Sequence, residues 1–251
     1  MSDPEIEIAK LVVSILGFGG TIMTIAMATR QYRRAEQWKR AEFVAKEVKE
    51  FENSLVVRNA LAMVDWGARR VNLRLKQNPE DGDLIRVTRE MQWKALLPHS
   101  VKDDSVMFRA EDLEFGESDQ ETDRQGFTSI EARIRDTYDM FLDHLQRFSN
   151  VIESGLVGSD ELHPYLSYWL NTIASPEGSQ KDIAWRCALF TYINFYEFKG
   201  VQQLFSAFGR PIEPGAPLFR KLFGQLRNAD LKEALERSLK QKRQQAEEED
   251  A

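Results

Sequence analysis

Three aspartates, Asp136, Asp139 and Asp143, follow one another at steps of three and four residues. On a helix this spacing places carboxylates one turn apart, where they could share a metal ion or act as an acid–base pair. The helix period of about 100° per residue also sets them opposite an apolar face. That face consists of Ile130, Ile134, Phe141, Leu145 and Ile152. We therefore expect the carboxylates to face water, with Arg147 pairing with Asp143, and keep metal or acid–base chemistry as the weaker alternative.

The other reactive side chains are few and scattered. The three histidines, His99, His144 and His163, show no metal-binding spacing, and the single cysteine, Cys187, excludes a disulfide or a cysteine zinc site within one chain. Cys187 is expected to be a small buried side chain. No catalytic residue, metal site or cofactor is therefore assigned, and a non-enzymatic protein is expected.

Aromatic side chains are dense between residues 165 and 198. Ordinary helix packing is the favoured interpretation, because aromatic rings bury the most area per residue. A ligand pocket and a membrane-facing surface remain as alternatives. The pocket alternative would involve Tyr165, Tyr168, Trp169, Trp185, Tyr192 and Tyr196.

Residues 11–29 carry no charge, and as a helix they would span about 28 Å, the thickness of a bilayer core. The preceding residues are acidic and the following ones basic, which predicts an uncleaved anchor with its N-terminus outside. A cleaved signal peptide, suggested by the Ala26–Met27–Ala28 triplet, and a buried soluble helix are the alternatives. The glycines in this stretch lack the spacing of a dinucleotide-binding loop.

Two sets of residues are assigned around this anchor. Small residues along one face would let two membrane helices pack closely, namely Ser14, Gly17, Thr21, Thr24 and Ala28. Basic and amphipathic residues that follow would lie at anionic lipid headgroups, namely Arg30, Tyr32, Arg33, Arg34, Trp38, Lys39 and Arg40.

The rest of the chain predicts an all-α cytoplasmic bundle of about seven helices. Ala41, Val44, Val48 and Phe51 form a narrow apolar stripe suited to packing on a partner helix, as in a coiled coil. A break at Asn53 or Ser54 is expected to precede a helix that runs to Leu75. Residues 84–97 are expected to form a third helix, although Leu84 to Thr88 alone could be a strand.

The following segments are predicted from turn, capping and charge signals. Residues 102–126 are rich in carboxylates and are expected to form a solvated loop, with a calcium loop as a weak alternative. Thr128 with Glu131 predicts a capping box, Gly155 a helix end, and Pro164 a place in a first helical turn. The domain boundaries expected are 1–10 outside the cell, 11–29 in the membrane, 30–101 juxtamembrane and first bundle helices, 102–126 acidic loop, 127–227 aromatic-rich core and 228–251 charged helix with an acidic tail.

Four segments carry a resemblance: AEQWKRAEFVAKEVKEF, IRDTYDMFLDHLQRF, LHPYLSYWL and FYEFKGVQQLF. They resemble blocks in uncharacterised bacterial proteins that have one N-terminal membrane helix. The resemblance implies an inner-membrane protein with a helical cytoplasmic part and transfers no active-site residue.

The 251 residues have a net charge of −6, so a generally basic nucleic-acid-binding surface is not expected. The favoured function is a membrane-tethered interaction or assembly module that self-associates and binds a cytoplasmic protein partner. The alternatives are a ligand-triggered effector that perturbs the membrane and an enzyme at the membrane face that uses carboxylates with His144 or His163.

Overall fold

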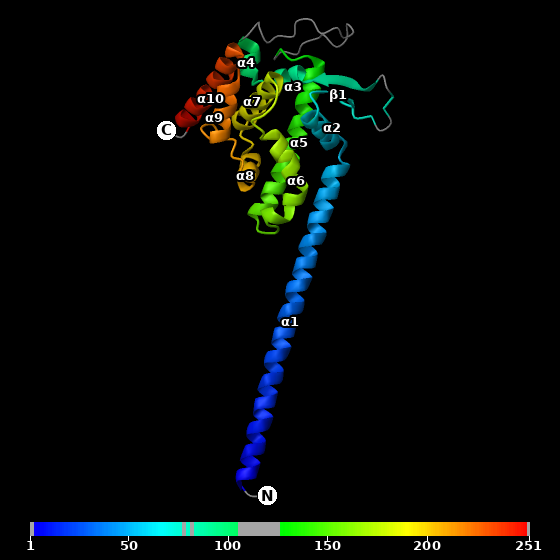
Figure 1. Cartoon of the computed structure of the whole chain (residues 1–251), viewed down its shortest axis with the longest axis vertical. Helices are drawn as coiled ribbons and strands as arrows, with labels where there is room; N and C mark the ends of the chain where they lie inside the picture. Colours follow the sequence, from blue (N-terminus) through cyan, green and yellow to red (C-terminus); the bar gives the residue numbers. More distant parts are fainter. Residues whose placement is uncertain (1–2, 77–78, 81–82, 105–125, 250–251) are drawn as a thin grey trace. The chain divides into compact units, whose positions relative to one another are not determined.

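The computed structural model describes the backbone of residues 3–76, 79–80, 83–104 and 126–249 (Figure 1). Side chains are described over the same ranges except for residues 3–22, 26, 102–104, 246 and 249. The chain is predominantly helical, which confirms the helical class. It is not purely α, because residues Ala68–Val71 and Ile85–Thr88 form a two-stranded antiparallel sheet.

The chain divides into two units, Met1–Glu47 and Val48–Ala251. The first belongs to helix α1 (Asp3–Asn53), which also supplies the first residues of the second. Among the residues whose side chains are described, no helix has a stretch both long and apolar enough to cross a membrane. Most of the predicted anchor, residues 11–29, lies outside those residues, so the anchor stays a prediction.

The end of α1 confirms the expected break at Asn53 or Ser54 and shows which helix packs on the apolar stripe. The helix ends at Asn53, and Ser54 caps α2 (Leu55–Asp65) by accepting a hydrogen bond from the Val57 amide. Phe51 packs on Phe141 and Phe148 of helix α5 (Ser129–Glu153), with ring centroids 6.2 and 5.3 Å apart. For this end of the apolar stripe, the partner helix therefore belongs to the same chain.

The expected continuation of α2 to Leu75 is wrong. The helix ends at Asp65, and strand β1 (Ala68–Val71) pairs with β2 (Ile85–Thr88) so that Val71 lies opposite Ile85. The alternative that residues 84–88 form a strand is confirmed over Ile85–Thr88. Helix α3 (Arg89–Ala95) follows, with Thr88 as its N-cap. Pairing between distant segments overrides the helical spacing of the apolar residues.

The next helices follow their predicted signals with one exception. Helix α4 (His99–Asp104) leads to residues 105–125, so the predicted acidic loop lies almost wholly outside the described residues. The capping box of Thr128 and Glu131 opens α5, and Gly155 follows its end with φ +70°. Pro164 lies within α6 (Ser159–Ile173), five residues after its first residue and thus beyond the first turn.

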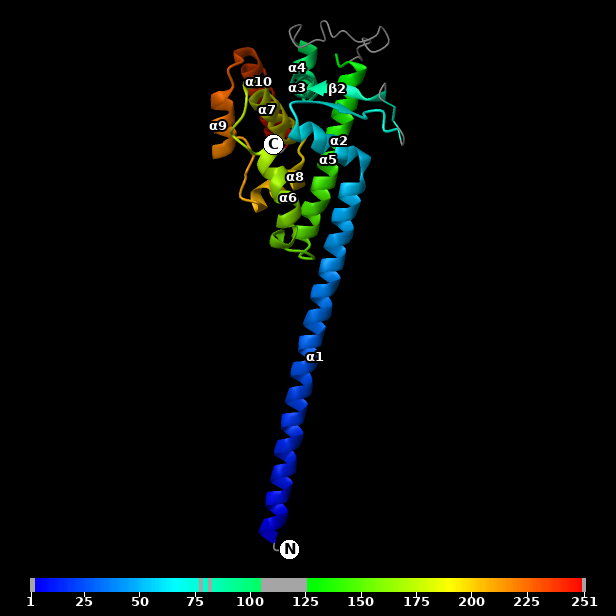
Figure 2. The same cartoon turned by 45° about the vertical axis from the view of Figure 1, so that its right-hand side comes forward.

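Helix α7 (Gln180–Phe195) is the central element of the second unit. Every residue from Ile183 to Ile193 is buried, and the helix packs against α3, α8 (Lys199–Ala207), α9 (Pro217–Gln225) and α10 (Ala229–Glu249). A helix that is buried on every side does not need a polar face, so its sequence shows no amphipathic pattern. In Figures 1 and 2, α9 and α10 lie on one side of this unit and the two-stranded sheet on the other.

Helices α5 and α8 approach closely at Gly200. A Cβ atom at this position would lie 2.6 Å from Cγ of Gln146. Glycine is therefore favoured here by space, because a side chain would have to displace that of Gln146, and not by its φ, which is outside the left-handed region.

Candidate anion-binding cavity

Helices α9 and α10 both pack on α7 and leave a cavity between them. In α10, Leu231, Leu235 and Leu239 repeat every four residues and are buried. Because these leucines face the core, the adjacent row of side chains on α10, spaced by four, four and three residues, faces the cavity. The row consists of Lys232, Glu236, Lys240 and Arg243.

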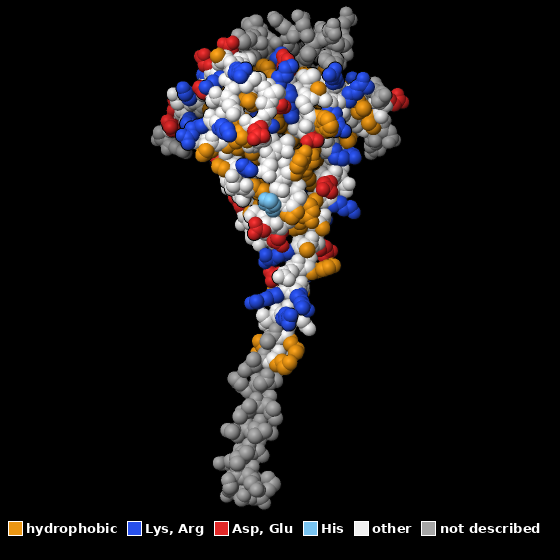
Figure 3. All heavy atoms as spheres, in the orientation of Figure 1, with side chains coloured by type: hydrophobic (Ala, Val, Ile, Leu, Met, Phe, Trp, Pro, Cys, Tyr) orange, Lys and Arg blue, Asp and Glu red, His pale blue; other side chains and the backbone are white. Residues whose placement is uncertain are grey.

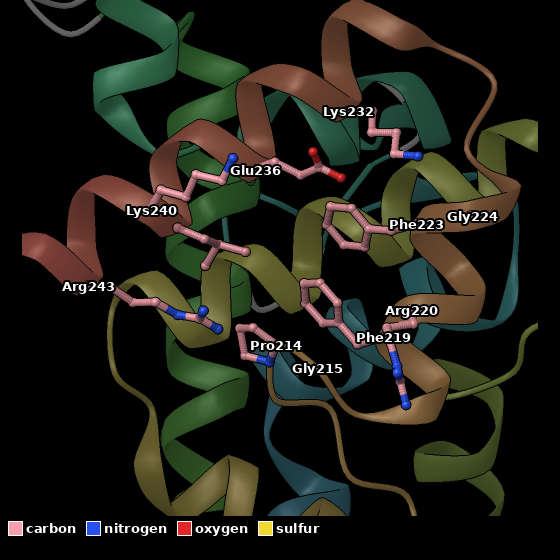
Figure 4. A pocket seen from close by; sticks show the side chains of 11 residues that line it. Pro214, Gly215, Phe219, Arg220, Phe223, Gly224, Lys232, Glu236, Lys240 and Arg243 are labelled. Atoms are coloured by element: carbon pink, nitrogen blue, oxygen red, sulfur yellow. The ribbon is translucent and has the colours of Figure 1, made fainter.

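The other wall comes from α9 and the loop before it. Pro217 begins α9, and the nearly parallel rings of Phe219 and Phe223 stack with centroids 4.3 Å apart. Figure 4 shows both rings pointing towards α10, with Pro214 beside them. The cavity measures about 370 Å³, which is within the range of small-molecule sites. Its lining is completed by Gly215, Arg220, Gly224 and Leu239.

Positive charge dominates the cavity. Four cationic side chains, Arg220, Lys232, Lys240 and Arg243, line it together with one carboxylate, Glu236. Within the described part of the chain, none of these four cations has a carboxylate within ion-pair distance. Guanidinium and ammonium groups above an apolar aromatic wall can bind an anionic ligand that also carries a flat or apolar part.

A second hollow of about 220 Å³ adjoins this cavity, because Pro214, Leu239 and Arg243 line both. Here Glu197, with φ +55°, forms an ion pair of 3.0 Å with Lys242. The hydrogen bond and charge of Lys242 lower the pKa of the Glu197 carboxyl. Lys242 is thus already neutralised, whereas Arg243 remains available to a ligand.

The aromatic residues proposed as one pocket lie in two groups. Trp185 and Tyr192 are buried on α7, and Tyr196 follows that helix. On α6, Tyr165 and Tyr168 are exposed, and the Tyr168 hydroxyl donates to Asp65 over 2.6 Å. The cavities described above are lined by neither group, and Trp169 lies edge-on against Tyr168.

A buried polar network centres on Arg89, which the sequence analysis did not identify. Its Nε donates to Asp182 over 2.8 Å, its Nη2 to the Val64 carbonyl over 2.7 Å and its Nη1 to Gln92 over 2.9 Å. The network continues through Tyr138, which donates to Gln92 and accepts from the Trp185 indole. Most of its polar atoms bond within the network, although Nε2 of Gln92 is buried without a hydrogen-bond partner in the described part of the chain, and we assign the network a structural role.

A second cluster surrounds Arg135. The guanidinium lies 4.6 Å from the centroid of the Tyr192 ring and 4.9 Å from that of Tyr196, and it donates to the carbonyls of Ala95 and Leu97. The Tyr196 hydroxyl lies 2.8 Å from Nδ1 of His99. These contacts join the ends of α3, α5 and α7 to the start of α4.

The three aspartates differ in their surroundings. Asp136 and Asp143 are exposed as expected, but Asp139 is partly buried and accepts a hydrogen bond of 2.5 Å from the Tyr192 hydroxyl. The solvent-facing interpretation is therefore wrong for Asp139, because the Tyr192 side chain of α7 reaches its side of the helix. Arg147 lies 3.9 Å from Glu50. Among the described residues, no three carboxylate, histidine or cysteine side chains come together as a metal site.

The histidines lie against different aromatic partners. His144 contacts Phe51 edge-on, His163 stacks on Phe208 with centroids 5.5 Å apart, and His99 contacts Tyr196. Cys187 is fully buried, as predicted, and burial raises the pKa of its thiol to about 12.

The residues assigned to membrane packing and to lipid headgroups are only partly described. The side chains of Ser14, Gly17 and Thr21 lie outside the described residues, whereas Thr24 and Ala28 are exposed. The basic and amphipathic set from Arg30 to Lys39 is exposed, and Arg40 pairs with Glu36 over 2.8 Å.

The cavity itself was missed in the sequence, although a signal existed. The spacing of Lys232, Glu236, Lys240 and Arg243 beside a leucine stripe places them on one helical face. The opposite wall of the cavity is formed by α9, and its position depends on how α9 packs on α7. No local sequence pattern predicts this packing. Comparison with known protein families, curated proteins and solved structures gives no match for this chain.

Proposed function

We propose that this protein is a membrane-tethered helical module that binds an anionic small molecule between α9 and α10 and acts without catalysis. The observation that carries the proposal is a set of four cations beside the stacked Phe219 and Phe223 rings, for which the residues that the structure describes supply no ion-pair partner. Mutual repulsion among four cations is relieved when an anion binds. The apolar rings would hold a flat or aliphatic part of the same ligand.

The membrane tether is supported by α1. Met23, Ile25 and Met27 lie in the last part of the uncharged stretch, shortly before Arg30, and leave 60%, 61% and 52% of their surface exposed. Exposed apolar side chains followed by basic and aromatic ones are typical of a helix that leaves a bilayer. We propose a single pass through the bacterial inner membrane, with the N-terminus outside and the second unit in the cytoplasm.

Self-association is a further part of the proposal. The small residues at positions 14, 17, 21, 24 and 28 would let two membrane helices approach, and a cytoplasmic protein partner could then bind the assembled second units. Crosslinking of the solubilised full-length protein tests this. A chain that stays monomeric in several detergents would contradict it.

The tether is tested by washing membranes from expressing cells with alkaline carbonate. We expect the protein to remain in the membrane, with a C-terminal reporter protected from protease outside the cell. A protein that is released by carbonate would overturn the tether and leave the ligand proposal standing.

The ligand is tested by the thermal unfolding of the full-length protein with pyrophosphate and with ATP as probes. ATP joins a flat ring to phosphates, and a ligand that binds only the folded state raises the unfolding temperature. We expect ATP to stabilise more than pyrophosphate does, and Lys240→Gln/Arg243→Gln to weaken probe affinity about tenfold. Arg227→Gln/Arg237→Gln, an equal charge change at two exposed arginines outside the cavity lining, is the matched control. Equal responses of both variants would contradict the proposed site.

The presence of the cavity and the predicted anchor in one chain favours a second candidate function, a ligand-triggered membrane effector. Ligand binding could trigger the anchor to perturb the membrane. This predicts that expression together with the ligand depolarises cells and that Gly17→Leu or Gly20→Leu removes the effect. A constant membrane potential in the presence of a ligand shown to bind would refute it.

A further inference from the structure

The two-stranded sheet carries positive charge on its outer face. The register places Arg70 directly opposite Arg86, while Val71 and Val87, of the alternate face, are buried. Both arginines are exposed. Like charges directly opposite each other destabilise a strand pair, and a two-stranded sheet is only marginally stable to begin with.

No carboxylate in the described part of the chain compensates this repulsion by an ion pair with Arg69, Arg70 or Arg86. Arg74, in the loop after β1, is also exposed. Arg69 lies opposite Val87, on the alternate face, but is itself exposed. We call Arg69, Arg70, Arg74 and Arg86 the basic ribbon. Figure 3 shows Lys and Arg side chains beside hydrophobic ones at the right-hand edge of the molecule, where Figure 1 places the sheet.

Two exposed apolar side chains flank the basic ribbon. Trp66 precedes β1 with 51% of its surface exposed, and the Arg69 guanidinium lies 5.2 Å from the centroid of its ring. Leu75 follows β1 with 42% exposed and with φ +54°, a conformation that is unfavourable for leucine.

The turn that exposes Leu75 is fixed from inside. The Leu75 amide donates to the carbonyl of Asn72, whose side chain exchanges hydrogen bonds with the backbone of Lys76. The buried Asn59 side chain donates to the same Asn72 carbonyl over 2.8 Å. Buried amides thus hold a strained turn that presents an apolar side chain to water, a feature that points to a binding role.

We propose that the basic ribbon is a second membrane contact, in which the arginines bind the phosphates of anionic lipids and Trp66 and Leu75 enter the headgroup region. Guanidinium groups bind phosphate oxygens in pairs, and tryptophan favours the bilayer interface. The phosphates of a nucleic acid would also bind the arginines, but a nucleic acid would provide no apolar environment for Leu75. The proposed tether would keep the second unit in the vicinity of the membrane and so raise its effective concentration there, but lipid binding by the ribbon does not depend on the tether.

The test uses full-length protein in vesicles of phosphatidylcholine alone or mixed with phosphatidylglycerol. A fluorophore is attached at Ala68→Cys, on the same face as Arg70, while the buried Cys187 stays unlabelled. Lipids with a nitroxide on the headgroup quench a label that lies at the surface. We expect at least about twofold more quenching in the anionic vesicles.

Arg70→Gln/Arg86→Gln should abolish this difference, whereas Arg133→Gln/Arg227→Gln, an equal charge change at two other exposed arginines, should preserve it. Quenching that is the same in both vesicles, in protein that resists carbonate, would overturn the ribbon and leave the tether intact. Protein that carbonate releases, but that still binds anionic vesicles through Arg70 and Arg86, would support the ribbon and refute the tether. An oligonucleotide that binds through the same arginines, with no effect of lipid, would overturn the lipid proposal in favour of nucleic acid.

Discussion

The guanidinium of Arg89 lies over the indole of Trp185, with its Cζ atom 4.0 Å from the ring centroid. Both side chains are buried, and Asp182, in the first turn of the same helix as Trp185, neutralises the arginine over 2.8 Å. Burial tends to raise the pKa of the Asp182 carboxyl, but hydrogen bonds from Ser179 and Arg89 outweigh this effect and lower it. One arginine thereby joins α2, α3 and α7.

Replacing this arginine tests the network. Arg89→Lys keeps the charge but loses the fork that reaches Asp182, Gln92 and two carbonyl groups at once. We expect a loss of about 2–4 kcal/mol in the free energy of unfolding, measured by denaturant titration of the full-length protein in detergent. Arg69→Lys, which alters the exposed contact with Trp66, should change it by less than about 0.5 kcal/mol. Similar effects of the two changes would contradict the assigned role.

The Asp139–Tyr192 hydrogen bond predicts a pH dependence. Burial raises the pKa of the Asp139 carboxyl, although Tyr192 and Arg135 oppose the shift. A raised pKa in the folded state means that ionisation of Asp139 costs stability as pH rises from the unfolded pKa, 3.8, through the folded one. Asp139→Asn, which still accepts the bond, should therefore gain stability relative to the native protein as pH rises above the unfolded pKa. Asp143→Asn is the exposed control, and the same pH profile in both variants would refute the expectation.

The approach of α5 to α8 makes Gly200 a packing residue. Alanine is intrinsically better than glycine inside a helix, yet Gly200→Ala should destabilise the protein by about 1–3 kcal/mol, because the new methyl group would collide with Gln146. Adding Gln146→Ala should restore most of this loss in thermal unfolding experiments. Gly224→Ala, in α9, meets no atom within 4 Å and serves as the control. Failure of the double variant to recover would show that the collision is not the cause.

Cys187 should be inert in the folded protein. Its thiol pKa of about 12, raised from 9.0 by burial, lowers the thiolate fraction about 10³-fold. We expect maleimide to modify Cys187 at pH 8 only after denaturant is added, as followed by mass spectrometry. Rapid labelling of the native chain, at the rate of an exposed cysteine introduced at Ala68, would mean that α7 opens readily.

Much of the helical framework could be predicted because its signals are local. Ser54, Thr128 and Gly155 mark helix ends through their own hydrogen bonds or backbone angles. The amphipathic pattern of α5 also predicted that Ile130, Ile134, Phe141 and Leu145 are buried, whereas Ile152, predicted on the same face, is only half-buried.

Tertiary structure decided the remainder. Residues 68–71 have helical spacing of apolar side chains, yet they form a strand because a partner segment 17 residues or so away supplies the hydrogen bonds. Asp139 and Arg89 became internal because helices distant in sequence cover them and supply partners for their charges. The α9–α10 cavity likewise exists only where two helices meet on a third, so its charges could be found in the sequence but their common orientation could not.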